Sequence, residues 1–225
     1  NKNKSYYFRI LRLMMSGRNV FVLAGGNGLT NPYANTIEKK VSTSSIISAL
    51  EAENVDNKDD IMEIQEDKKK SYSIWGYSEN DKNLKNNAPN ENDIIFITNH
   101  DAAIYLVTVL GVFKSNQLDA FWAGRRSWNN LIIFKSVIRV FIPYYTGKNV
   151  EEWIRDHPFS PGLSSLKYVE KRLNNNDSFR NIIGREDKSA HIQGALKLKL
   201  SAEEVLNNLF KYCMRTHFEC LVKEI

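Results

Sequence analysis

The chain has 225 residues, of which 42% are hydrophobic and 11% aromatic, so it can bury a packed core and is not globally disordered. Its 31 Lys and Arg against 26 Asp and Glu give a formal charge of +5, which is compatible with nucleic-acid binding without proving it. No apolar run approaches the ~20 residues of a transmembrane helix, and the first residues lack a secretion-signal pattern. With only two cysteines, we expect a reduced intracellular protein, in the nucleus or the cytoplasm.

Two short strands are predicted near the start of the chain. Alternating side chains over residues 6–13 predict the first, and the apolar run 20–24 predicts the second. The second run ends at the glycine-rich stretch 25–28, whose spacing is neither that of a dinucleotide-binding loop nor that of a P-loop. We therefore interpret this stretch as a turn.

The segment that follows is polar. Residues 31–70 hold many Asn, Asp, Glu, Lys and Ser side chains and few aromatics, with short helices expected over 44–53 and after the carboxylates of Asp59 and Asp60. Such a composition is typical of a segment tolerated on a surface. We expect an insertion at about 20–58.

The middle of the chain carries the strongest strand signals. Residues 71–74 alternate polar and apolar side chains and predict a strand that delivers Trp75 to its end, followed by a polar loop over 79–92. Apolar runs then predict a hairpin in a buried sheet and two further strands, over 94–97, 104–112, 131–134 and 137–142.

The C-terminal third of the sequence has two predicted helices. Residues 163–173 read as one helix, and strand-like alternation returns over 192–200. Ser201 and Glu204 form a capping box at the start of a helix over about 202–222. Its apolar stripe contains Val205, Leu206, Leu209, Phe210, Cys213 and Leu221. The mixed order of elements predicts one α+β domain over 1–225, a mixed β-barrel or strongly curved sheet packed with several helices.

Motifs of catalysis and metal binding are absent from the sequence. The four histidines, His100, His157, His191 and His217, are scattered without metal-ligand spacing, and no nucleophile elbow is present. We expect a protein that is not an enzyme and that needs no cofactor or metal.

Three tryptophans stand beside small, polar or loop residues. Trp75 precedes a glycine, and Trp122 and Trp128 flank the small and basic stretch 123–127. Three indoles meeting at one place would form an apolar slot for a flat, methyl-bearing ligand. The alternative, which composition by itself favours, is that they are ordinary core tryptophans.

The order of these features resembles the YTH domain, a family that reads N6-methyladenosine in single-stranded RNA. The run Ser71-Tyr72-Ser73-Ile74-Trp75, a polar loop, two strands, Phe121-Trp122, a loop and the strands over 131–142 follow one another as in that family. Residues 8–12 resemble its first strand, and 183–186 resemble its Gly-Arg-Asp turn with Glu186 in place of aspartate. The resemblance spans about 6–210 and implies a YTH/PUA-like fold.

The resemblance also implies residue roles. The methyladenine cage would consist of Trp75, Trp122 and, as its variable third wall, Trp128. Main-chain groups of Gly76 and Tyr77 would read the base edge. An upstream Asn or Asp side chain would assist them, and both Asp60 and Asn19 remain candidates for it. Contacts to the RNA backbone are expected from Arg185, which matches the phosphate-binding arginine, and from Arg12, Arg125, Arg126 and Lys188.

The sequence therefore leaves three hypotheses. The first is a non-catalytic reader of N6-methyladenosine in single-stranded RNA, which stacks a splayed base on aromatic faces. The second is a methyl-adenine-sensing module that acts on DNA, as in a modification-dependent restriction system. The third is a protein-interaction domain with its tryptophans in the core.

Overall fold

The computed structural model describes residues 19–24, 35–52, 58–66, 68–81, 84–98, 102–122, 128–143, 145–146, 176–177, 179–184, 195–216 and 223–224. Its strands are β1 (Val20–Ala24), β2 (Val41–Ser42), β3 (Ser71–Tyr72), β4 (Ile74–Tyr77), β5 (Ile94–Thr98), β6 (Ala102–Lys114), β7 (Asn130–Pro143), β8 (Tyr145–Thr146), β9 (Asn176–Asp177), β10 (Ala195–Lys197) and β11 (Lys223–Glu224). Its helices are α2 (Asn35–Glu38), α3 (Thr43–Glu51), α4 (Lys58–Glu66), the 3-10 helix η2 (Leu118–Trp122), α7 (Phe179–Ile183) and α8 (Ala202–Thr216).

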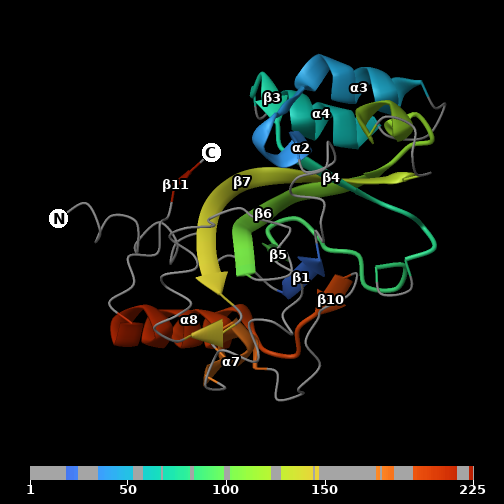
Figure 1. Cartoon of the computed structure of the whole chain (residues 1–225). Coiled ribbons are helices and arrows are strands. Elements are labelled where there is room, and N and C mark those ends of the chain that lie inside the picture. Colours follow the sequence, from blue (N-terminus) through green and yellow to red (C-terminus); the bar gives the residue numbers. More distant parts are fainter. Residues whose placement is uncertain are drawn as a thin grey trace.

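A strongly curved mixed sheet forms half of a barrel at the centre of the described residues (Figure 1). Its strand order is β10-β1-β5-β6-β7-β11, and β4 pairs with β7 as well. Only β1 and β5 run parallel among its pairs. Helices α2, α3 and α4 gather at one end of the sheet, and α7 and α8 lie at the other. The predicted α+β class and the strongly curved sheet with helices are thus confirmed.

The hairpin predicted from the two apolar runs is present as β5 and β6, which pair antiparallel. The two further strands predicted over 131–134 and 137–142 are instead one continuous strand, β7. Its pairing with β6 shifts register on both sides of Val109. Such irregularities bend a strand and increase its twist, so one long strand can follow the curve of the sheet.

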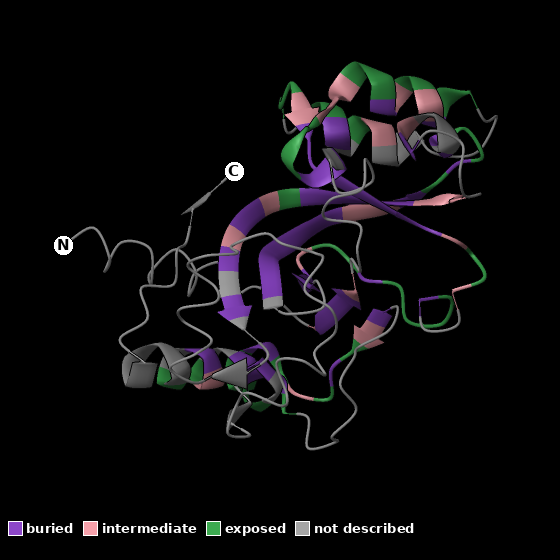
Figure 2. Cartoon of the chain, in the orientation of Figure 1, coloured by how far each residue is buried: buried purple, intermediate pink, exposed green. Residues whose placement is uncertain are grey.

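The core consists of three clusters. Side chains of β1 alternate between two of them: Val20 and Val22 pack toward α7 and α8, whereas Phe21 and Leu23 face the space that the curved sheet encloses. A third cluster joins α3 and α4 to the beginning of β7. Figure 2 shows β6 and β7 buried along most of their length, with exposed residues on the outer side of α3 and in the loop after β4. We call these clusters the α8 cluster, the enclosed cluster and the α3–α4 cluster.

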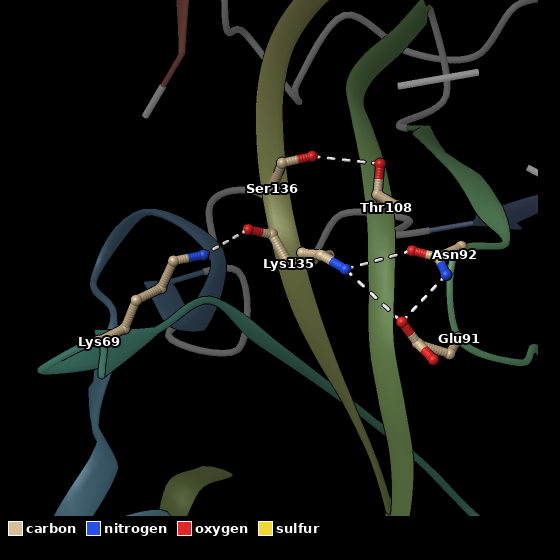
Figure 3. Close-up of polar contacts among 6 residues, drawn as sticks. All are labelled: Lys69, Glu91, Asn92, Thr108, Lys135 and Ser136. Carbon is tan, nitrogen blue, oxygen red and sulfur yellow. Dashed lines mark hydrogen bonds and ion pairs between the residues drawn. The ribbon is translucent and has the colours of Figure 1, made fainter. Parts of the chain in front are cut away.

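Polar contacts occupy the stretch of β6 and β7 between the two helix-covered ends (Figure 3). The hydroxyl of Ser136 lies 3.1 Å from that of Thr108, across the two strands. The ammonium of Lys135 reaches Glu91 at 3.5 Å and Asn92 at 3.4 Å, and so connects β7 to the loop that precedes β5. Lys69 donates to the carbonyl of Lys135 at 2.6 Å. The exposed contacts of Lys69 and Lys135 add little stability individually, but they connect neighbouring loops to the sheet.

The segment interpreted as a surface insertion at about 20–58 contributes to the core instead. Strand β1 lies between β10 and β5 in the sheet. Ile37 of α2 and the pair Ile46 and Leu50 of α3 are completely buried. A polar composition was misleading here because α3 exposes one face and buries only the other.

The predicted capping box at α8 is confirmed. The backbone N–H of Ser201 donates to the carboxylate of Glu204 at 2.8 Å, and the N–H of Glu204 donates to the hydroxyl of Ser201 at 3.2 Å. The Ser201 N–H lowers the pKa of Glu204 below its usual range because it stabilises the charged carboxylate. Val205 and Leu209 of the predicted stripe are buried.

Several predicted elements lie outside the described residues: the strand over 6–13, the turn over 25–28, the helix over 163–173 and the end of the last helix over 217–222. Among the helices that the structure does describe, none has both the length and the apolar composition to cross a bilayer.

Candidate functional site

The candidate site is built on β4, which lies along the beginning of β7. Trp75 stands opposite Ile132 in this antiparallel pair and Gly76 opposite Leu131. The sequence predicted that Trp75 would come at the end of a strand, but it lies inside β4, and Tyr77 ends the strand. On the other side of β4, the Thr36 hydroxyl donates to the Ile74 carbonyl at 2.9 Å. Helix α2 therefore holds β4 from the side away from β7, which fixes the position of Trp75.

Alternation along β4 sends its side chains to opposite faces. Trp75 and Tyr77 belong to the enclosed cluster, whereas Ile74 belongs to the α3–α4 cluster. Gly76 shares the face of Ile74. Trp122, at the end of η2, and Trp128, just before β7, pack against that same face. Residues from three distant parts of the chain therefore meet around β4.

Gly76 lies where Trp122 and Trp128 contact the backbone of β4. A Cβ at this position would lie 2.4 Å from Cε3 of Trp128 and 2.7 Å from Cη2 of Trp122, closer than carbon atoms can approach. The absence of a side chain is what lets both indoles lie directly on the backbone of β4. Sequence reasoning assigned Gly76 only main-chain contacts with a base, although an isolated glycine in a strand is itself a sign that something approaches closely.

The three indoles meet as the sequence predicted, with Trp128 in the middle. Its ring centroid lies 6.0 Å from that of Trp75, with a tilt of 36° between the planes. It lies 5.0 Å from that of Trp122 at 68°, an edge-to-face contact. Trp75 and Trp128 are thus the more nearly parallel of these two pairs, and Trp122 stands across Trp128. The geometry favours Trp75 and Trp128 as facing walls and Trp122 as the floor, rather than Trp75 and Trp122 as the first two walls.

The indoles fill the space between them in this structure. Trp75 is 8% exposed and Trp122 only 2%, whereas Trp128 is half-buried. A base stacked between two rings needs a contact of ~3.5 Å on each side, or about 7 Å in all. The ring centroids of Trp75 and Trp128 are only 6.0 Å apart and their planes are tilted by 36°, so the two rings leave less space than that. A base stacked between these two rings would require them to move apart, and Trp128 is the more exposed of the two.

One polar atom in this cluster has no partner. The indole Nε1 of Trp122 is buried, and no acceptor lies within hydrogen-bonding distance among the residues that the structure describes. Most buried donors in proteins are paired, because an unpaired one loses its hydrogen bond with water. This N–H is therefore a potential donor to a ligand.

A cavity of about 710 Å³ lies at the end of β4, and none of the three indoles is among its lining residues. Tyr77, on the same face of β4 as Trp75, lines it together with Asn130, its partner on β7. Its lining consists of Tyr77, Glu79, Asn80, Leu84, Lys85, Ala88, Pro89, Asn90, Glu91, Val112, Lys114 and Asn130. This volume lies in the range of small-molecule sites.

The charges of this cavity are balanced. Two lysines and two glutamates line it, and the Lys114 ammonium lies 3.3 Å from the Glu79 carboxylate. A hydrogen bond from Asn129 and the Lys114 charge lower the pKa of Glu79. Burial, assisted by the charge of Asp81, raises the pKa of Tyr77 to about 12, so its phenol stays neutral and can donate near pH 7. The cavity suits a ligand that offers hydrogen-bonding edges more than one that offers a single strong charge.

The two candidates for the upstream side chain have different surroundings. Asn19 donates from its backbone N–H and its side-chain amide to the carboxylate of Asp93, at 2.9 and 3.1 Å. Asp93 is fully buried, and this pairing joins the beginnings of β1 and β5. Asn19 thus has a structural role, and no described contact brings it to the indoles. Asp60 lies in the first turn of α4, which contributes Ile64 to the cluster of Trp122, but its side chain is not described.

The predicted phosphate contacts, Arg12, Arg125, Arg126, Arg185 and Lys188, all lie outside the described residues, as do the four histidines. Gly184, just before Arg185, follows α7 with a positive φ of 67°, and the side chain of Leu200 packs where its Cβ would stand. A turn with a left-handed glycine therefore directly precedes Arg185, as expected of a helix end.

Comparison of the chain with protein-family models, with curated proteins and with solved structures found no match. Among the described residues, no three His, Cys, Asp or Glu side chains are grouped as metal ligands. The chemistry of the site must therefore be inferred from its own residues.

Proposed function

We propose that the chain is a non-catalytic reader of N6-methyladenosine in single-stranded RNA, with a YTH/PUA-like fold. The base would stack between Trp75 and Trp128, and its methyl group would lie against Trp122. The observation that carries this proposal is the meeting of three indoles around Gly76, at the edge of a curved sheet. The resemblance of the sequence to the YTH domain supports it, since it names the same three tryptophans.

The energetics fit such a role. Stacking of one base on an aromatic ring contributes ~1–3 kcal/mol. Burial of one additional methyl group adds about 0.8 kcal/mol, and roughly twice that where an unmethylated amine would lose water without gaining a partner. The methylated base should therefore bind roughly 4- to 15-fold more tightly than the unmethylated one. The basic balance of the chain would add affinity for phosphate without selectivity.

The titration of four oligonucleotides tests this proposal. We expect a short single-stranded RNA with one N6-methyladenosine to bind roughly 4- to 15-fold more tightly than the same RNA without the methyl group, as measured by fluorescence anisotropy. Quenching of tryptophan emission should accompany binding, since the base would stack on the indoles. The matching DNA pair is the control, and a stronger preference for methylated DNA would favour a DNA-sensing module instead.

A second candidate is a protein-interaction domain in which the tryptophans belong to the core. The specific observation in its favour is the burial of Trp75 and Trp122 and the contact of both rings with Trp128. The absence of binding to all four oligonucleotides would favour this candidate.

The cavity beside Tyr77 gives a separate prediction. If the RNA strand continues from the indoles past Tyr77, filling the cavity should weaken the binding of RNA without weakening the binding of a single nucleoside. We expect Ala88→Trp to lower affinity for a methylated pentanucleotide several-fold, because Ala88 lines the cavity, and to leave the affinity for free N6-methyladenosine unchanged. Calorimetry with both ligands measures this. Ala52→Trp, at another exposed alanine, is the matched control, and equal losses for both ligands would contradict the prediction.

A further inference from the structure

The buried indole N–H of Trp122 has no described acceptor, and this distinguishes Trp122 from a purely apolar wall. Its surroundings belong to the α3–α4 cluster, and the nearest members that the structure describes are apolar or aromatic: Phe121 lies 5.8 Å away and Trp128 5.0 Å, both edge-to-face. Neither ring offers more than a weak acceptor, its π face. Among the described residues, this donor therefore has no full hydrogen bond.

The position of this donor relates it to the site. Cζ2 and Cη2 of Trp122 face Gly76, at 2.9 and 2.7 Å from the position of an added Cβ. In an indole, Cζ2 is bonded to the ring carbon that carries Nε1, so the N–H belongs to the ring edge adjoining β4. It thus lies beside Gly76, on the face of β4 that Trp122 and Trp128 cover.

We infer that the Trp122 N–H donates a hydrogen bond to a ring nitrogen of the bound methylated purine, so that Trp122 determines specificity as well as contributing apolar surface. This inference rests on the function proposed above. A purine ring has acceptors at N1, N3 and N7, whereas the indole N–H is only a donor. A ligand that supplies one of these acceptors removes an unpaired buried donor, and a ligand without it leaves the donor unpaired.

The consequence is selectivity against bases that have no acceptor at that position. A site with a buried group built to pair with its ligand rejects an analogue that lacks the partner atom more strongly than an apolar site rejects a missing methyl group. We expect roughly a 5- to 100-fold loss of affinity when the matching ring nitrogen is replaced by CH.

A double-mutant cycle tests the inference. The ligands are a short RNA with N6-methyladenosine and the same RNA with its 1-deaza, 3-deaza or 7-deaza analogue. The proteins are the wild type and a Trp122→benzothienylalanine variant, in which sulphur replaces the N–H at nearly constant shape. One deaza analogue should bind the wild type roughly 5- to 100-fold more weakly, and this penalty should disappear in the variant. The same replacement at Trp75 is the matched control and should leave the penalty in place.

The stability of the free protein supplies the second readout. Loss of a donor that has no partner should leave the melting temperature of the Trp122 variant unchanged or higher. A clear decrease would show that the N–H is already satisfied in the free protein, for example by the face of Trp128, and would overturn the inference. Trp122→Phe, made genetically, repeats the binding test if the first variant does not fold.

The outcomes separate the inference from the function on which it rests. If the wild type does not prefer methylated RNA, both fail. If it prefers methylated RNA but every deaza penalty is equal in the wild type and the Trp122 variant, the function stands and the role of the N–H is wrong.

Discussion

Trp128→Ala is expected to weaken the binding of N6-methyladenosine RNA roughly 5- to 150-fold while the protein remains folded. The loss corresponds to the ~1–3 kcal/mol of one base–aromatic stack. Trp128 is the best of the three tryptophans for this test because it is only half-buried, whereas Trp75 and Trp122 fill the core. Fluorescence anisotropy measures the affinity, and circular dichroism with thermal melting checks the fold.

The matched control for this variant is Phe121→Ala. Phe121 is also a partly buried aromatic packed on Trp122, at 5.8 Å, but it has no described contact with Trp75. We expect this variant to lose some stability and to keep its preference for the methylated base. If Trp128→Ala binds methylated RNA as tightly as the wild type, the stacking site is elsewhere. If both variants lose binding equally, the effect arises from the cluster as a whole and not from a wall.

Gly76→Ala should have the second large effect, because it would push indole rings away from the backbone of β4 without removing a ring. The new Cβ would overlap Cε3 of Trp128 and Cη2 of Trp122, so one or both indoles must move off β4. Overpacking of this kind typically costs 1–3 kcal/mol of unfolding free energy. Because Trp122 and Trp128 would be displaced together, we expect the preference for methylated RNA to be lost, even at temperatures where the variant is fully folded.

Gly111→Ala is the control for this effect. Gly111 also lies in a strand, β6, and its added Cβ would meet the ring of Phe113 at 2.6 Å, whereas none of the three atoms nearest to that Cβ belongs to an indole. Chemical denaturation gives the stability of both variants, and RNA titration gives their methyl preference. Gly111→Ala should reduce stability alone. Retention of full methyl preference by Gly76→Ala would show that the contacts of Trp122 and Trp128 with β4 are not needed for recognition.

The contact among the three indoles has a cost for binding. The rings bury one another in the free protein, and a base must replace those contacts with its own. Since the centroids of Trp75 and Trp128 are only 6.0 Å apart, the two rings must separate to admit a stacked base. Part of the stacking energy of ~1–3 kcal/mol per ring is spent on this separation.

Local patterns in the sequence were sufficient to predict much of the secondary structure. Continuous apolar runs identified the β5–β6 hairpin, because a strand that is buried on both faces needs apolar residues at successive positions. The Ser201–Glu204 capping box is also confirmed, and it was predictable because it depends only on residues three positions apart. The convergence of Trp75, Trp122 and Trp128 was predicted too, but from a resemblance and not from local physics.

Tertiary structure alone decided the arrangement of the site. Nothing in the local sequence showed that β1 would be a central strand, that Asn19 would be paired with Asp93, or that Gly76 would carry two indoles on its bare backbone. These features depend on pairs of residues far apart in the sequence, from 46 positions for Gly76 and Trp122 to 176 for Phe21 and Lys197, whose contact follows from the pairing of the strands. Periodicity fixes which face of a strand a side chain occupies, whereas only long-range packing fixes what it meets there.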